Sequence, residues 1–287
     1  MPPASGQSGG KSGGELKQAV LLAGAGRMGA AMARGWLRNP KAAGFGKLHV
    51  IEPQPSEEVA DWAKGGKINL NRKPQPVDIA VLAMKPQGFA KAASGVAAWI
   101  GPNTLVVSIM AGVTMRTISA ALGVTKVARA MPNTPGAIGM GVTGYALSSK
   151  CGEAEKAATE KLLAPLGGVV GPLDETKIDA VTAVSGSGPA YVFLLAEALE
   201  AAAKAAGLPD AVAAELARKT VIGAGALLSE GGDPADLRKA VTSPGGTTAA
   251  ALDVLMAPGA MPELIRKAVE AAAKRGAELS REAEKKS

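Results

Sequence analysis

Cysteine and histidine are nearly absent, with one Cys (Cys151) and one His (His49) in 287 residues. A single cysteine excludes an intramolecular disulfide and any zinc or iron–sulfur site held by several cysteines, and a single histidine excludes a metal site built on a His pair. We therefore expect no bound metal. A Ser–His–Asp hydrolase would have to use His49 alone. The low cysteine content fits a reducing compartment, so we expect a cytoplasmic protein.

Aromatic residues are also scarce, at 3% of the chain against 47% for all apolar residues. The core is therefore expected to consist mainly of Ala, Val, Leu, Ile and Met. No apolar run reaches about 18 residues without a charge, so we predict no membrane span. Residues 1–14 lack the apolar stretch of a signal peptide and are expected to form a disordered tail outside the fold.

The charge balance is basic, with 32 Lys and Arg against 25 Asp and Glu and a formal charge of +7. The sequence nevertheless lacks a Lys- or Arg-rich run interleaved with aromatics, which binding of single-stranded nucleic acid would favour. We expect no nucleic-acid partner. The positive charge suits an anionic small molecule better.

Short apolar runs alternate with helical patterns between residues 15 and 173, which predicts βαβ units and a mainly parallel sheet. The predicted strands cover residues 18–23, 48–51, 78–83, 105–109 and 126–131, and two further strands at 142–147 and 168–170 are expected at one edge of the sheet. The predicted helices between them cover residues 30–37, 57–64, 87–100 and 115–122.

From residue 174 to 287 the pattern is almost entirely helical, so we place a domain boundary near Leu173. The predicted helices cover residues 178–206, 211–228, 235–240, 248–256 and 262–284. Residues 190–206 are apolar nearly all round, and such a helix has to be buried on all sides. Packing against a second copy of the chain is the simplest way to bury it. Burial inside the monomer is the alternative.

A glycine-rich loop follows the first predicted strand: Gly24-Ala25-Gly26-Arg27-Met28-Gly29. In this position Gly24 permits a tight turn, Gly26 lets the backbone approach a pyrophosphate, and Gly29 allows close helix–strand packing. A turn that binds nothing is the alternative. Glu52 ends the next strand, where an acidic residue bonds the adenosine ribose and favours NAD(H) over NADP(H).

Further candidate residues follow later strands, at the edge of the sheet where ligands bind. In Ala83-Met84-Lys85-Pro86, Lys85 could reach a ribose or phosphate, or remain a solvated lysine. The small residues Ala111 and Gly112 would let backbone approach the nicotinamide. Asn133, between two prolines, could bond the carboxamide or simply cap a turn.

The helical half contains two motifs with many small and hydroxyl residues. Ser185-Gly186-Ser187-Gly188-Pro189-Ala190 is expected to open the long apolar helix as its N-terminus. In the stretch 241–248 (VTSPGGTT), the N–H groups of Gly245, Gly246 and Thr247 would form a nest for an anion such as a carboxylate. Thr248 could then bond a substrate nitrogen or hydroxyl. A plain helix–helix turn is the alternative.

Together these motifs resemble the pyrroline-5-carboxylate reductase family. The stretches that carry the resemblance, in the family's order, are GAGRMG (24–29), AMKP (83–86), RAMPNTP (129–135), DAVTAVSGSGPAY (179–191) and VTSPGGTT (241–248). The similarity covers residues 18–280, and the last two motifs are the specific ones.

The resemblance implies an α/β Rossmann-like N-terminal domain followed by an all-α C-terminal dimerisation domain. It implies reduction of 1-pyrroline-5-carboxylate to L-proline with NADP or NAD as cofactor in its reduced form, and a homodimer with a decamer of dimers as the larger assembly. By the same resemblance, the substrate carboxylate and ring nitrogen would be bound by Ser243, Gly245, Gly246, Thr247 and Thr248. The cofactor would be lined by Gly24, Ala25, Gly26, Arg27, Met28, Ala83, Met84, Lys85, Pro86, Ala111 and Gly112. An Asn often meets the adenosine end, and Asn69 and Asn71 are both candidates.

The expected chemistry needs no histidine, since a protonated cyclic imine is already electrophilic and its reduction depends mainly on alignment. We expect the dinucleotide to lie across the first half of the chain while residues 243–248 hold the ring over its hydride face, with Thr248 orienting the nitrogen. A β-hydroxyacid dehydrogenase, the nearest rival, would carry a catalytic Lys and Asn where Val192 and Leu195 stand. Another cyclic-imine reductase, or a non-catalytic nucleotide sensor, remains a further alternative.

Overall fold

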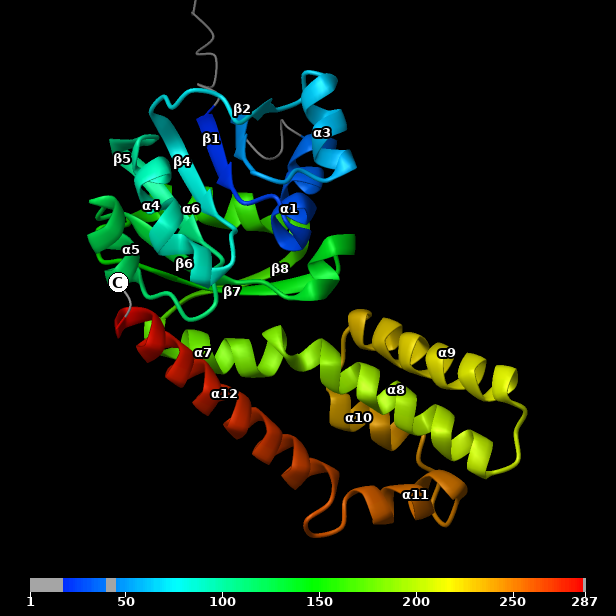
Figure 1. Cartoon of the computed structure of the whole chain (residues 1–287). Helices are drawn as coiled ribbons and strands as arrows, with labels where there is room; N and C mark the ends of the chain where they lie inside the picture. Colours follow the sequence, from blue (N-terminus) through cyan, green and yellow to red (C-terminus); the bar gives the residue numbers. More distant parts are fainter. Residues whose placement is uncertain (1–17, 40–44, 286–287) are drawn as a thin grey trace, which may run out of the picture.

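The computed structural model describes residues 18–39 and 45–285, and it divides into a sheet-based half and a helical half (Figure 1). The tail predicted at residues 1–14 lies outside the described residues. Strands and helices alternate up to Leu173, and every regular element after that residue in the described chain is helical. The alternation and the helical second half agree with the sequence-based prediction.

The sheet has eight strands in the order β3-β2-β1-β4-β5-β6-β7-β8. All neighbours run parallel except β6 and β7, which are antiparallel, and the strands expected at one edge do form it. The strands are β1 (Gln18–Ala23), β2 (Phe45–Ile51), β3 (Asn69–Leu70), β4 (Val77–Leu82), β5 (Ile100–Ser108), β6 (Val127–Met131), β7 (Gly141–Leu147) and β8 (Gly167–Leu173).

Both faces of the sheet are covered, which explains why β1 is apolar from Ala19 to Ala23. Val20 and Leu22 point into one core, and Leu21 and Ala23 point into the other. Helices α1 (Arg27–Arg38), α3 (Glu57–Lys64) and α6 (Glu153–Leu163) contribute to the first core, and α4 (Phe89–Ala97) and α5 (Met115–Leu122) to the second. This two-sided arrangement leaves the loops at the carboxyl ends of the strands free to bind a ligand.

Two elements of the sheet half were not predicted, and one helix is shorter than expected. The short β3 was missed, as was α6, whose sequence EAEKAATEKLL buries only Thr159, Leu162 and Leu163 and so has little apolar periodicity. The helix predicted over 87–100 ends at Ala97, because Ile100 already pairs with Val77 at the start of β5.

The helical half consists of α7 (Ile178–Val181), a π-helical turn (Thr182–Gly186), α8 (Gly188–Ala205), α9 (Asp210–Ser229), α10 (Pro234–Ala240), α11 (Thr247–Leu255) and α12 (Met261–Lys285). The prediction that Ser185–Ala190 opens the long helix is confirmed, since α8 begins at Gly188 with Pro189 in its first turn, but no side chain caps this start. Ser187 has helical backbone angles and makes no capping bond, and Ser185 donates its hydroxyl to the carbonyl of Val181. The helical path therefore continues through the π turn.

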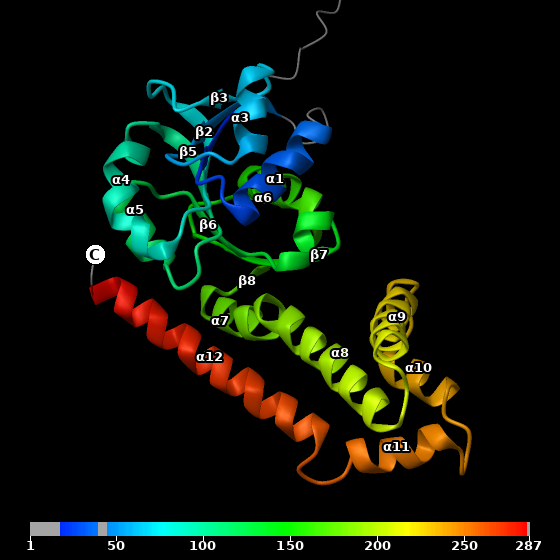
Figure 2. The ribbon, with the colours of Figure 1, turned by 45° about the vertical axis from the view of Figure 1, so that its right-hand side comes forward.

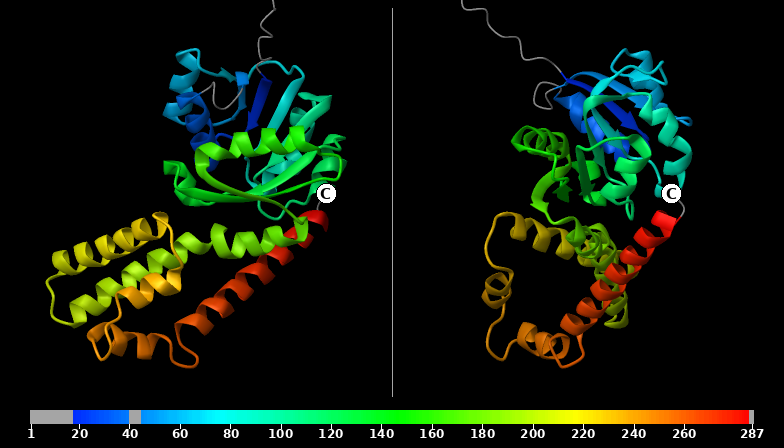
Figure 3. Two further views of the ribbon diagram at one scale, coloured as in Figure 1. Left: turned by 180° about the vertical axis from the view of Figure 1, so that it is seen from behind. Right: turned by 90° about the vertical axis from the view of Figure 1, so that its left-hand side faces the viewer.

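Helices α8, α9 and α11 form an open arm that extends away from the sheet, while α12 returns to it (Figures 2 and 3). None of the α8 residues, all of which the structure describes, is buried. Phe193 on α8 is 62% exposed and Ile222 on α9 is 63% exposed. Burial of the apolar helix inside the monomer is therefore wrong, because one chain leaves these faces open.

Among the described residues, one helical stretch, Glu175–Ala205, is long and apolar enough to cross a membrane by length and composition alone. Its apolar 18-residue window has a mean hydropathy of 1.3 and is 11% buried. The prediction of no span used a stricter criterion, an apolar run free of charges. A single such helix is weak evidence, since exposed apolar helices also pack against other subunits.

Candidate active site

The glycine loop joins β1 to α1 and is shaped by contacts that exclude side chains. Gly24 has φ +96°, and a Cβ there would lie 2.7 Å from the backbone nitrogen of Met84. A Cβ on Gly29 would collide with the carbonyl oxygen of Gly24. Gly26 caps α1 without any side-chain bond, and a Cβ on it would face open space. The first N–H groups of α1 are thus available to a phosphate, as the motif predicted.

A cavity of about 760 Å³ opens beside this loop. It brings together many of the predicted cofactor residues, namely Gly24, Gly26, Glu52, Ala83, Met84 and Lys85. Its remaining wall comes from the end of β2 and from α4, and the lining residues that sequence reasoning missed are Ala23, Ile51, Pro53, Gly88, Lys91, Ala92, Ser94, Gly95 and Val96. Small residues at helical spacing, such as Ala92 and Gly95, are equally typical of a helix packed in a core, so the sequence carried no specific signal for this wall.

Glu52 ties the end of β2 to the glycine loop. Its Oε2 accepts the Ala25 N–H at 2.8 Å, and its Oε1 accepts the Gln54 N–H at 3.0 Å. Asn71 donates its amide to the Glu52 carbonyl and accepts the Glu52 N–H, both at 2.9 Å. Of the two Asn candidates, Asn71 therefore contacts Glu52, whereas Asn69 pairs with His49 within the sheet.

Several other predicted cofactor residues stand outside the lining of this cavity. Ala25 contributes its N–H to Glu52, and Arg27 is exposed at the start of α1. Asn133 accepts the Val142 N–H through its side-chain oxygen at 2.9 Å, which holds the turn before β7. None of these three residues lines the cavity, and their cofactor roles stay predictions, as do those of Met28 and Pro86.

The loop after β5 is occupied by the protein itself. Gly112 has φ +73°, and a Cβ on it would lie 3.4 Å from the backbone of Leu279 and Ser280, near the end of α12. Gly112 thus lies next to α12, a contact that the sequence did not suggest. Ala111 is exposed next to it and remains the candidate for approaching a nicotinamide.

The predicted anion nest has only part of the expected local geometry, because the Gly246 N–H is engaged within the turn. Gly245 has φ +68°, the Gly246 N–H donates to the Ser243 carbonyl at 3.0 Å, and Gly246 caps α11. The first N–H groups of α11, those of Thr247 and Thr248 among them, have no partner within the helix and carry the positive end of its dipole. A carboxylate would be stabilised at this point.

Within one chain, the nest and the glycine loop do not meet. Figures 1 and 3 place α11 at the far end of the helical half, away from α1 and the loop. Residues 243–248 therefore do not lie over the glycine loop of their own subunit, and their place over the hydride face stays a prediction. The reason is the extended arm, which α8 and α9 carry outward from the sheet.

Two other candidates lack the chemistry of a site. His49 is buried in β2 with its ring centroid 5.0 Å from that of Trp99, and burial and the charge of Lys47 lower its pKa. Among the described residues, no group of His, Cys, Asp or Glu is placed to hold a metal ion.

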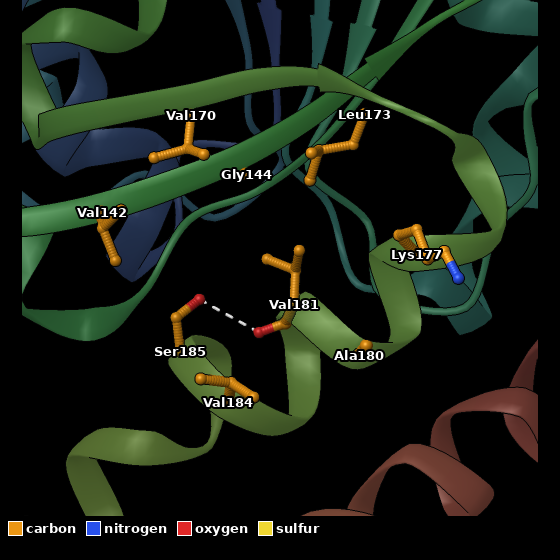
Figure 4. A pocket seen from close by; sticks show the side chains of 9 residues that line it. All are labelled: Val142, Gly144, Val170, Leu173, Lys177, Ala180, Val181, Val184 and Ser185. Atoms are coloured by element: carbon orange, nitrogen blue, oxygen red, sulfur yellow. Dashed lines mark hydrogen bonds between the residues drawn. The ribbon is translucent and has the colours of Figure 1, made fainter.

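A second cavity, of about 330 Å³ between β7, β8 and α7, is almost entirely apolar, and its Ser185 hydroxyl already donates to the Val181 carbonyl (Figure 4).

Both halves of the chain match family models. Residues 18–112 match NADP oxidoreductase coenzyme F420-dependent, and residues 175–279 match pyrroline-5-carboxylate reductase dimerisation. The pyrroline-5-carboxylate reductase of Pseudomonas aeruginosa is 40% identical over 205 residues, which are 71% of this chain and 75% of that protein.

The chain belongs to the pyrroline-5-carboxylate reductase family.

Solved structures of this family have the same fold. The Coxiella burnetii pyrroline-5-carboxylate reductase superposes with a TM-score of 0.83 at 32% identity, covering 92% of this chain and 99% of that one. The Plasmodium falciparum pyrroline carboxylate reductase, solved with NADP bound, has a TM-score of 0.75 at 26% identity over 93% and 100% of the two chains. Membership of the family identifies the chain as an NAD(P)H-dependent oxidoreductase and a homo-oligomer.

Proposed function

We propose that this chain reduces 1-pyrroline-5-carboxylate to L-proline, the last step of proline biosynthesis. The observation that supports this most strongly is its 40% identity with a pyrroline-5-carboxylate reductase over most of both chains. The glycine loop and the nest on α11 supply the two sites that such a reaction needs, one for a dinucleotide and one for a carboxylate. Bound NAD(P)H supplies the hydride that the C=N carbon of the ring accepts.

The cofactor side is built by the sheet half. The open face of Gly26 and the free N–H groups of α1 would bind the pyrophosphate, while Glu52 and the wall of α4 would hold the adenosine. Lys85 lines the same cavity and would add a positive charge beside the phosphates. Ala111, Gly112 and Asn133 follow neighbouring strands and are proposed to border the nicotinamide end.

The substrate side is built by residues 243–248. The N–H groups of Thr247 and Thr248 would bind the ring carboxylate, with Ser243, Gly245 and Gly246 shaping the turn. The Thr248 hydroxyl would hydrogen-bond the ring nitrogen and so set the face of the ring that accepts hydride. Because the imine binds already protonated, the site needs no histidine as proton donor.

A second subunit would complete this site. The nest is remote from its own glycine loop, and the exposed apolar side chains of α8, α9 and α11 lie on the segment that matches the dimerisation family. Pairing of two arms would bury these faces and bring the nest of one subunit to the cofactor of its partner. We propose domains at 15–173 and 174–287, a homodimer as the basic unit, and a decamer of dimers as the larger assembly.

Absorbance at 340 nm tests the function. The full chain should oxidise NADH or NADPH when 1-pyrroline-5-carboxylate is added, and the absorbance should stay constant when the imine is omitted. A six-membered cyclic imine carboxylate and 1-pyrroline without a carboxylate serve as comparison substrates. Reduction of the six-membered ring alone would favour another cyclic-imine reductase, and a chain that binds the dinucleotide without oxidising it would be a sensor.

Free Cys151 supports a reducing, cytoplasmic location.

A further inference from the structure

The end of β2 presents a carboxylate to the cavity beside the glycine loop. Glu52 lines this cavity together with Gly24 and Gly26. In sheets of this kind the residue at this position faces the adenosine ribose of a dinucleotide. NAD(H) has two ribose hydroxyls here, which can donate to a carboxylate, whereas NADP(H) replaces one of them by a phosphate that carries negative charge.

The Glu52 carboxylate is held in place from two sides. One oxygen accepts the Ala25 N–H at 2.8 Å and the other accepts the Gln54 N–H at 3.0 Å. Each carboxylate oxygen has a second lone pair, so the group can still accept hydrogen bonds from ribose hydroxyls. Asn71 holds the main chain of Glu52 through its own side chain. Moving the carboxylate away from a phosphate would break these bonds.

The connection from β2 to α3 offers little to a phosphate. Pro53 and Pro55 have no N–H, and the Gln54 N–H already binds Glu52. The Ser56 hydroxyl oxygen caps α3 by accepting the Val59 N–H. The donors that residues 53–55 and the Ser56 hydroxyl could offer a phosphate are therefore missing or engaged.

The charges on α3 add to this effect. Glu57 and Glu58 occupy its first turn, and Glu58 pairs with Arg34 through two bonds of 2.8 and 2.7 Å, so this arginine is already engaged. Arg72 and Lys73 follow Asn71 in the sequence, but the lining of the cavity in the described chain does not include them.

The cations of that lining, Lys85 and Lys91, lie on the connection after β4 and on α4. Since β2 and β4 flank β1 on opposite sides, these lysines come from the wall of the cavity opposite to that of Glu52. They are placed for the pyrophosphate and the adenine more than for a group on the ribose beside β2. The ribose side of the cavity is thus acidic and the opposite side basic.

We propose that Glu52 makes this reductase select NADH over NADPH. The inference rests on the proposed function, because it assumes that a reduced dinucleotide binds in this cavity. It distinguishes this chain from the P. falciparum relative, whose structure contains NADP. Asn71 acts through Glu52, as a positioning residue.

Dissociation constants measured without the imine test this proposal. Binding of NADH and of NADPH to the full chain is followed by nicotinamide fluorescence, and the wild type should bind NADH at least about tenfold more tightly. Glu52→Gln keeps the size of the side chain and removes its charge, so NADPH should bind more tightly and the preference should shrink severalfold. Glu52→Ser provides a second, smaller variant, and both leave the main-chain bonds of Asn71 in place.

Glu57→Gln is the matched control, because it removes one carboxylate from the same connection at an exposed position outside the lining. It should leave the preference unchanged within about twofold, since an exposed charge is screened. Equal or tighter NADPH binding by the wild type, or a preference that survives in both Glu52 variants, would overturn the proposal. If neither dinucleotide binds, the proposed function fails with it. Selective NADH binding without imine reduction would contradict the proposed function alone.

Discussion

The ammonium of Lys126 lies 2.7 Å from the Glu155 carboxylate and thereby joins the start of β6 to the first turn of α6. The other Glu155 oxygen accepts the Gly152 N–H at 2.8 Å, which caps the helix. The pKa of Glu155 is lowered to about 2, mainly by the hydrogen bond from Lys126 and next by that from the Gly152 N–H. The contact therefore stabilises the part of the sheet formed by β6, β7 and β8, which lies at the opposite end from β3.

We expect Glu155→Gln to lower the free energy of unfolding by up to about 2 kcal/mol at neutral pH. Because the folded-state pKa is below the unfolded one of 4.5, the charge stabilises the fold above pH 4.5 and this stabilisation is lost as the pH falls toward about 2. The difference between wild type and variant in urea unfolding should therefore shrink across that window. A difference that stays constant with pH would contradict this account. Glu153→Gln, at an exposed neighbouring position, is the control.

Two glycines of the loop should respond differently to alanine. Gly29→Ala forces a methyl group against the Gly24 carbonyl and should cost about 1–3 kcal/mol of stability as well as dinucleotide binding. Gly26→Ala meets no protein atom, so it should leave the unliganded melting temperature nearly unchanged and weaken dinucleotide binding at least about tenfold by blocking the pyrophosphate. Melting curves and fluorescence titrations separate the two effects. Unchanged binding in Gly26→Ala would remove the loop from the cofactor site.

Thr248→Ala should lower kcat/KM for the imine by about 10- to 100-fold, because the ring nitrogen loses its orienting hydroxyl. NADH affinity should change by less than about twofold, since the nest is separate from the cavity of the glycine loop. Ser229→Ala, which removes a hydroxyl at the end of α9, is the control and should keep full activity. Equal losses of turnover and of dinucleotide binding would refute the substrate role of Thr248.

Ile222→Asp places a charge on the exposed apolar face of α9 and should dissociate the oligomer, because that face could no longer be buried against a partner. We expect imine reduction to fall in proportion to the loss of dimer in sedimentation velocity, while dinucleotide binding persists. Lys219→Ala, on the same helix, should remain oligomeric and active. A fully active monomer would show that one chain carries a complete site.

The sequence predicted most of the sheet because its strands are buried on both faces and read as uninterrupted apolar runs, as Val20 to Ala23 do. Helix α6 was missed for the opposite reason, since it buries few residues and its charges hide the period. The glycine loop was predictable because Gly29 is required by its contact with Gly24, five residues earlier. Gly24 is required by its contact with the end of β4, the strand that neighbours β1 in the sheet.

The wall of α4 and the placement of the nest were not predictable in the same way. Ala92 and Gly95 become part of a site only when α4 packs beside the loop, and nothing in their local sequence distinguishes them from core residues. The direction of the arm depends on the angle between the π-helical turn and α8. That angle is set by tertiary packing and not by the local sequence. The sequence therefore predicted that residues 243–248 form one cluster, but it did not predict that this cluster lies far from the glycine loop of the same subunit.

Helix α12 is a straight rod of about 37 Å that begins beside α11 and ends against the loop after β5. Its last turns bury Gly112 under Leu279 and Ser280. Trimming the polypeptide before these residues would uncover a glycine turn next to the expected nicotinamide, although the cut lies more than 160 positions away along the sequence. The last turns of α12 therefore belong to the architecture of the sheet half, although they follow the helical half in the sequence.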